Sequence, residues 1–177
     1  MKLREVFPKF NVNITFRDLE NSSGEYWFKS DFIVLDNELK RSLPGCAKIV
    51  LIHEMIHSTA SSKRLLRKER LEKFYGAFTE GSLAHRMEEC IAEIATMVAT
   101  MKLGLLNEYS RNVIIPGLKK HYTPDMCIPV REIRAALKYF AEDSISFEEE
   151  IEEVKTYLDA YMDIAFSDTY VSAEVAS

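Results

Sequence analysis

The chain has 177 residues, of which 47% are hydrophobic and 29% are charged, and its formal net charge is −5 at pH 7. This length and composition are typical of one globular domain that buries its own core, so we expect a single domain over residues 1–177. The mild negative charge excludes the general basic field with which proteins hold a nucleic-acid backbone.

The first part of the chain predicts a small sheet. Its strands are expected at residues 11–17, 25–29 and 31–35, the last two either as separate strands or as one bent strand. In the first of these runs apolar and polar residues alternate, which places Val12, Ile14 and Phe16 on one face. We therefore expect a small antiparallel sheet within residues 1–40.

Two roles are open for the last of these strands, at residues 31–35. It can line a cleft and pair with the extended backbone of a peptide, as edge strands that bind peptides do. It can equally be an ordinary strand that covers the helix after it.

Residues 44–60 are predicted to form a helix, and this helix carries the most informative pattern in the chain. Most of it is apolar, yet it contains His53, Glu54 and His57. Positions i and i+4 share one face of a helix, so both imidazoles can reach one metal ion. Glu54 lies about 100° around the helix from His53, where it can sit beside the metal without binding it. A zinc hydrolase needs this combination of ligands and base; the alternative is a helix with two unrelated histidines.

The segment after this helix is strongly basic. Its cations are Lys63, Arg64, Arg67, Lys68, Arg70 and Lys73. One interpretation of residues 63–73 is a contact with an anionic partner, either nucleic acid or an acidic substrate. The other is a solvated helix face or loop. The loop that follows, at 75–81, is placed to border a cleft.

A long helix is expected at residues 82–103, begun by Ser82 and ended by a glycine cap at Gly104. A zinc site with two histidines needs a third protein ligand and leaves its fourth position to water. Glu89 and Glu93 are four residues apart and share a face, so one can bind the metal while the other hydrogen-bonds a ligating histidine.

Two further points about this helix stay open. The acids Glu88, Glu89 and Glu93 can instead be solvated surface charges. His85 lies one turn before Glu89, so it can face the site or be a packed or surface histidine.

The remainder, residues 107–166, is predicted to be helical. The three helices are expected at 107–122, 129–143 and 147–166. Residues 167–177 are expected to form a flexible tail.

Cysteine usage and the absence of leader sequences suggest a cytoplasmic protein. Three cysteines at irregular spacing make no disulfide framework, and an odd count suits a reducing compartment. Residues 1–5 contain an acid and no apolar run follows, so we expect no signal peptide. No apolar stretch approaches the length of a membrane span, so no membrane partner is expected.

Taken together, these residues resemble a gluzincin, a zinc peptidase with His-Glu-x-x-His and a downstream glutamate on a second helix. In several such families the second helix reads Glu-x-x-Ala-Asp. Residues 89–93, Glu-Cys-Ile-Ala-Glu, are similar, with Glu93 in place of the aspartate. The resemblance implies that Glu89 is the third ligand and that Glu93 orients a ligating histidine.

A closer resemblance is to the metallopeptidase domain of ArdC-type antirestriction proteins and of phage polyvalent proteins. The similar runs are 57–60 (His-Ser-Thr-Ala), 64–67 (Arg-Leu-Leu-Arg), 75–78, 83–93 and 130–143. Ala60 stands where that family usually has glycine. The family's N-terminal domain for single-stranded DNA has no counterpart here, so the catalytic module alone is expected.

These resemblances imply an α+β, zincin-like fold: a small N-terminal antiparallel sheet packed on an active-site helix, followed by a mostly helical part. They imply one Zn²⁺ held by His53, His57 and Glu89, and a protein or peptide substrate cleaved by a metal-activated water with Glu54 as general base. They also connect the chain with phages and mobile elements that act against host defence.

A donor for the developing oxyanion is also expected, and His85, Tyr75 and Tyr109 are the candidates. The competing hypothesis is a zincin-fold binding protein that docks on DNA or protein without proteolysis. A metal-stabilised structural domain is a third hypothesis, although an open three-ligand site suits catalysis better.

Overall fold

The computed structural model describes residues 2–42 and 44–169, except for the side chains of Glu108 and Tyr109. Its helices are α1 (Leu3–Val6), α2 (Pro44–Thr59), α3 (Arg67–Tyr75), α4 (Leu83–Lys102), α5 (Glu108–His121), α6 (Val130–Phe140) and α7 (Glu148–Met162), with a 3₁₀ turn, η1, at Asn37–Lys40. Its strands are β1 (Asn13–Arg17), β2 (Gly24–Trp27), β3 (Phe32–Asp36), β4 (Ile128–Pro129) and β5 (Phe166–Ser167). The described chain is therefore α+β, as the sequence predicted.

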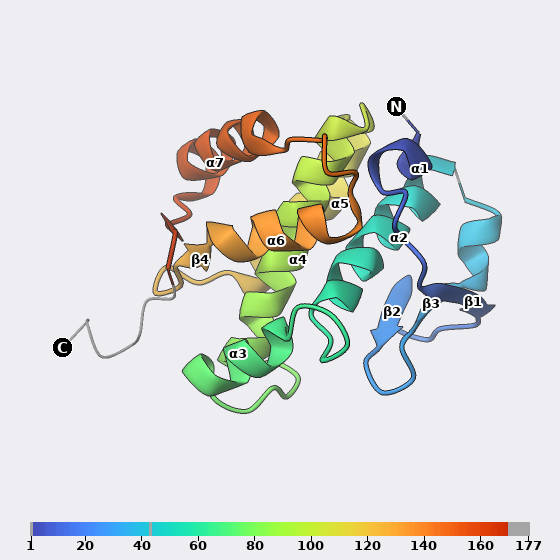
Figure 1. Ribbon diagram of the computed structural model, residues 1–177, viewed down its shortest axis with the longest axis horizontal. Helices are drawn as coiled ribbons and strands as arrows, with labels where there is room; N and C mark the ends of the chain where they lie inside the picture. The colour runs from blue at the N-terminus through green and yellow to red at the C-terminus, as the bar shows by residue number, and fades with distance from the viewer. Residues whose placement is uncertain (1, 43, 170–177) are drawn as a thin grey trace.

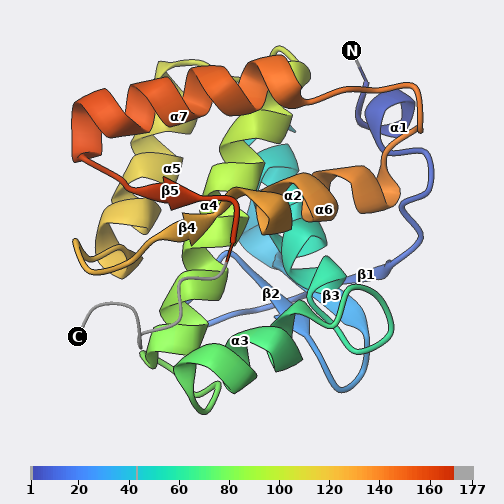
Figure 2. The ribbon, with the colours of Figure 1, turned by 60° about the vertical axis from the view of Figure 1, so that its left-hand side comes forward.

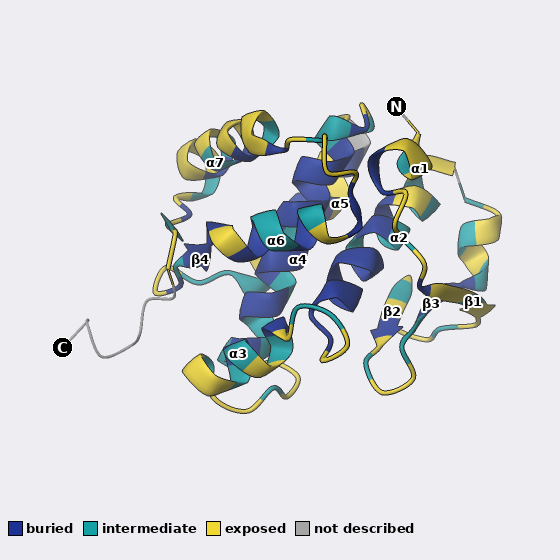
Figure 3. Ribbon diagram, in the orientation of Figure 1, coloured by how far each residue is buried: buried dark blue, intermediate teal, exposed yellow. Residues whose placement is uncertain are grey.

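Helix α4 runs through the middle of the molecule and contacts α2, α3, α5, α6 and α7 (Figures 1 and 2). Its start and end match the sequence signals: Ser82 Oγ accepts a hydrogen bond from the backbone N–H of His85 at 3.2 Å, and Gly104 has a left-handed φ of 68°. Most of α4 and the C-terminal half of α2 are buried (Figure 3). These two helices form the floor on which the candidate site is built.

The N-terminal sheet has the strand order β1-β3-β2 and packs on α2 through β2 and β3. Strand β2 is antiparallel to β3, as predicted, but β1 is parallel to β3, with Asn13 opposite Phe32. The prediction of an antiparallel sheet is therefore wrong for one of its two pairs. Alternation of apolar residues indicates which face each side chain takes, but it carries no information on which strand lies next to which.

The strand order distinguishes between the two roles left open for residues 31–35. Strand β3 is central and is hydrogen-bonded on both sides, so it has no free edge for a peptide. Strand β2, by contrast, is an edge strand, and Gly24, Glu25 and Tyr26 line the cleft described below. Of the two roles left open for residues 31–35, the structure therefore favours the ordinary strand that covers α2, since β3 contacts that helix.

The C-terminal part contains the three predicted helices, but the last two end early. Helix α6 stops at Phe140 instead of residue 143 because Ala141 is extended. Helix α7 stops at Met162, and Asp163 takes a left-handed φ of 52°. The chain then forms β5, which pairs in parallel with β4. The helix predicted to reach residue 166 is thus wrong over its last turn, because pairing between distant segments overrides local helical preference. Of the tail expected at 167–177, residues 170–177 lie outside the described residues.

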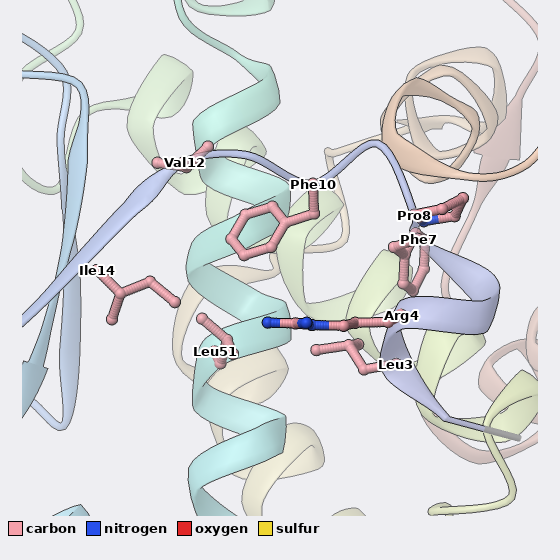
Figure 4. Close-up of a pocket in the computed structure, with 8 residues that line it drawn as sticks. All are labelled: Leu3, Arg4, Phe7, Pro8, Phe10, Val12, Ile14 and Leu51. Carbon is pink, nitrogen blue, oxygen red and sulfur yellow. The ribbon is translucent and has the colours of Figure 1, made fainter.

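A groove of about 600 Å³ opens between α1, the arm that follows it and α2 (Figure 4). Its lining is mainly apolar and consists of Leu3, Arg4, Phe7, Pro8, Phe10, Val12, Ile14 and Leu51. Arg4 extends from α1 towards α2 and is the one ionisable side chain of that lining.

None of the helices in the described part of the chain has the length and apolar character needed to cross a membrane.

Candidate metal centre

Helices α2 and α4 bring the predicted ligands together. His53 and His57, one turn apart on α2, face each other with their Nε2 atoms 2.9 Å apart. Glu89 of α4 lies opposite, with carboxylate oxygens 3.6 Å from His53 Nε2 and 3.5 Å from His57 Nε2. Neighbouring ligand atoms around a tetrahedral zinc ion are separated by about 3.3 Å, given metal–ligand bonds of about 2.0–2.1 Å. The three side chains could therefore hold one metal ion.

The donor set itself fits such an ion. Two imidazole nitrogens that face each other need either a proton or a cation between them, and a carboxylate completes the group. Two nitrogens and one oxygen beside an open cleft would leave a coordination position of such an ion free, whereas closed structural sites use four protein ligands.

Glu54 lies beside this cluster and lines the same cleft as His53. It is only 5% exposed, and burial raises the pKa of its carboxyl group. A glycine on β2 makes room for it: a Cβ on Gly24 would lie 3.0 Å from Glu54 Cγ and 2.6 Å from Val50 Cγ1. Close approach of the edge strand thus keeps Glu54 covered.

On the side away from the cluster, His57 contacts a buried ion pair between Glu88 and Arg67. Its Nδ1 lies 3.1 Å from Glu88 Oε1, and Arg67 binds both oxygens of that carboxylate at 2.7 Å. The Arg67 guanidinium also donates to Thr59 Oγ1 at 2.9 Å and to the Ile56 carbonyl at 3.1 Å. Arg67 is 0% and Glu88 1% exposed. Burial alone would raise the pKa of Glu88, but Arg67 and His57 outweigh it and hold that pKa below its ordinary value.

His53 has a looser support. Its Nδ1 lies 3.9 Å from Glu93 Oε2, which is beyond hydrogen-bond distance. Glu93 packs against Gly117 of α5, where a Cβ would overlap its carboxylate. Burial raises the pKa of Glu93 to about 6. The structure therefore brings Glu93 near His53, as predicted, but the hydrogen bond to a ligating histidine is made by Glu88.

Electrostatic interactions inside the cluster favour the charged forms of His53, His57 and Glu89. Burial alone would lower the pKa of His57, but the carboxylates of Glu89 and Glu88 outweigh it and raise that pKa well above its ordinary value. Burial and His57 would lower the pKa of His53, but Glu93 and Glu89 raise it overall. Burial would raise the pKa of Glu89, and the two histidines reverse this and lower it strongly. The site is thus built to concentrate negative charge around two imidazoles, which is the environment that a cation needs.

All four histidines of the chain line one cleft of about 360 Å³. Two of them are the candidate ligands, and the others are His85 of α4 and His121 at the end of α5. The backbone N–H of Gly81 donates to His85 Nδ1 at 3.3 Å, which leaves the proton of a neutral ring on Nε2. That Nε2 lies 3.5 Å from Glu89 Oε1, so it can donate into the cleft.

The other predicted oxyanion donors are placed differently. Tyr75 is not part of the cleft lining and packs against the hydrophobic core. The side chain of Tyr109 lies outside the described residues. The loop at 75–81 does border the cleft, as expected, through Phe78.

The basic segment at 63–73 makes internal ion pairs. Arg64 lies 2.7 Å and Lys63 lies 3.3 Å from Asp31, and the other pairs are Arg67–Glu88, Lys68–Glu72 and Arg70–Glu132. The segment therefore joins α3 and the preceding loop to the rest of the fold, which leaves less of its charge available to an anionic partner.

The sequence did not predict that Glu88 and Arg67 support His57, or that His121 lines the cleft. For His121 the only signal in the sequence is the scarcity of histidine, with four in the chain. The structure shows that all four line one cleft. Comparison with protein families, curated proteins and solved structures gives no significant match. The geometry of the cleft therefore carries the function proposed below.

Proposed function

We propose that this protein is a zinc-dependent peptidase with a zincin-like arrangement, in which His53, His57 and Glu89 hold one Zn²⁺ and Glu54 is the general base. The single observation that carries the proposal is the convergence of these three side chains beside an open cleft, with one ligand atom of each within 4.8 Å of the others. A buried carboxylate next to them, on the residue after the first histidine, adds the base.

The position of each side chain determines its role as metal ligand or general base. A zinc ion held there would supply Lewis-acid activation of a water molecule and of the substrate carbonyl. Glu54 accepts a proton from the attacking water and later donates it to the nitrogen of the leaving amine. Burial raises the pKa of Glu54, which makes its carboxylate a stronger base than an exposed glutamate.

Two groups support this chemistry from either side of the cleft. Glu88, fixed by Arg67, accepts the Nδ1 proton of His57 and so keeps Nε2 free as a ligand. In this proposal His85 Nε2–H, which faces the cleft near Glu89, donates to the carbonyl oxygen as that oxygen gains negative charge.

The test is digestion of a peptide library by wild type and by Glu54→Gln, with zinc content measured on both. We expect about one zinc per chain in each protein and a loss of cleavage of about 10²–10⁴-fold in the variant. The matched control is Glu153→Gln, an exposed glutamate on α7, which should cleave like wild type. Equal cleavage by Glu54→Gln, or a wild type that binds no zinc, would overturn the proposal. A biological effect that survives Glu54→Gln would favour a docking function.

A further inference from the structure

One wall of the cleft is a continuous row of aromatic rings. Tyr26 and Phe28 come from β2 and the turn after it, Phe78 from the loop between α3 and α4, and His85 from α4. Successive ring centroids are 4.9, 6.0 and 5.7 Å apart, and each successive pair is edge to face. These are the spacings and orientations that aromatic rings prefer. Three separate segments therefore converge to build one surface.

This row of rings, the aromatic wall, faces the candidate metal site. All four of its rings line the same cavity as His53, Glu54 and Glu89. His85, whose Nε2 is 3.5 Å from Glu89, connects the wall to the candidate site, and the ring of His121 continues the row at a centroid distance of 6.0 Å. A group held against the wall is thus held next to the reacting centre.

The wall is fixed in place from outside the cleft. Tyr26 is 8% exposed, and its hydroxyl donates to Asp31 Oδ1 at 2.7 Å. Lys68 Nζ lies 5.6 Å from the ring centroid of Phe28 and 5.4 Å from that of Phe78, within cation–π range. Phe28 and Phe78 nevertheless stay half-buried, so they keep apolar surface that a ligand can cover.

We propose that the cleft selects peptides with an aromatic side chain next to the scissile bond, and that Phe28, Phe78 and His85 receive that ring. This inference rests on the proposed peptidase function. The cavity of about 360 Å³ is of ligand-binding size, near the lower end of the usual range of about 300–1,000 Å³. Aromatic rings stack edge to face or offset on such a wall, which an aliphatic side chain cannot do.

The experiment measures binding of phenylalanine hydroxamate and alanine hydroxamate to the zinc-loaded protein by calorimetry. The hydroxamate group chelates zinc in both compounds, so the ratio of their dissociation constants reports the side chain alone. We expect phenylalanine hydroxamate to bind wild type about tenfold more tightly. In Phe78→Ala this ratio should fall to about twofold, with zinc affinity unchanged.

Two further variants keep the test decisive. Phe78→Leu retains apolar bulk and should fold normally, yet it should lose most of the ratio because it lacks a ring. Phe16→Ala, an exposed phenylalanine on β1, should keep the ratio of wild type. Equal binding of both hydroxamates to wild type, or a full ratio in both Phe78 variants, would overturn this inference and leave the peptidase proposal standing. A protein that binds no zinc would instead overturn the proposed function.

Discussion

The two candidate histidine ligands come from one helix, yet their surroundings differ. His57 is 9% exposed in its side chain and is hydrogen-bonded through Glu88 to the fully buried Arg67. His53 is 17% exposed and stands at 3.9 Å from its nearest supporting carboxylate, Glu93. A buried ion pair is costly to build and is tolerated only when its hydrogen bonds are satisfied. If the proposed metal site is correct, we expect His57 to be fixed before the metal binds and His53 to complete its contacts afterwards.

The largest expected effect is on the His57 side. Arg67→Met should leave Glu88 buried without its cation and reduce the free energy of unfolding of the metal-free protein by about 3–5 kcal/mol. Urea denaturation followed by circular dichroism measures this. The matched control is Arg134→Met, which removes an exposed bidentate pair with Glu148 and should cost about 1 kcal/mol or less. An equal decrease in the free energy of unfolding in both variants would show that the buried pair stabilises the fold no more than the exposed pair does.

Glu88→Gln tests the same side without removing volume. The amide cannot match the charge of the carboxylate that holds His57, so zinc affinity should fall by about 10–100-fold. Competition with a chromophoric chelator gives the affinity. An unchanged value would mean that His57 needs no support from Glu88.

The pH dependence of zinc binding should follow the raised pKa of His57. Burial alone would lower that pKa, but the Glu89 and Glu88 carboxylates outweigh it, so the metal-free protein keeps a proton on His57 to a higher pH than an ordinary imidazole does. Zinc displaces this proton, and affinity should therefore rise by up to about tenfold per pH unit until the pH exceeds the raised pKa, then level off. Calorimetry in buffers of different ionisation enthalpy counts the released protons. Binding at neutral pH with no proton release would contradict this reading.

The smallest effect is expected on the His53 side. Glu93→Gln removes a carboxylate that is beyond hydrogen-bond distance of His53, so zinc affinity should change by about threefold or less. The same chelator competition applies. If Glu93→Gln weakens zinc binding as much as Glu88→Gln, the contrast between the two histidines is wrong.

Much of the scaffold could be predicted from local signals. The i, i+4 spacing of His53 and His57 predicts a shared helix face, and Ser82 and Gly104 mark the ends of α4. These features depend on residues a few positions apart, where helix geometry determines what lies together.

The features that could not be predicted depend on contacts between distant segments. Glu88 and Glu89 are adjacent in sequence, but only packing of Arg67 from α3 determines that Glu88 turns inward to His57. The order of the strands and the arrival of His121 from α5 have the same origin. Apolar periodicity carries no information on such partners.

The central claim is that His53, His57 and Glu89 hold one zinc ion while Glu54 remains free to act as a base. Anomalous diffraction at the zinc edge, on crystals grown with zinc, tests this most directly. The account predicts one peak bonded to His53 Nε2, His57 Nε2 and a Glu89 oxygen, with the Glu54 carboxylate beside the metal but not bonded to it. No peak at this position, or a zinc ion ligated by Glu54, would contradict the account.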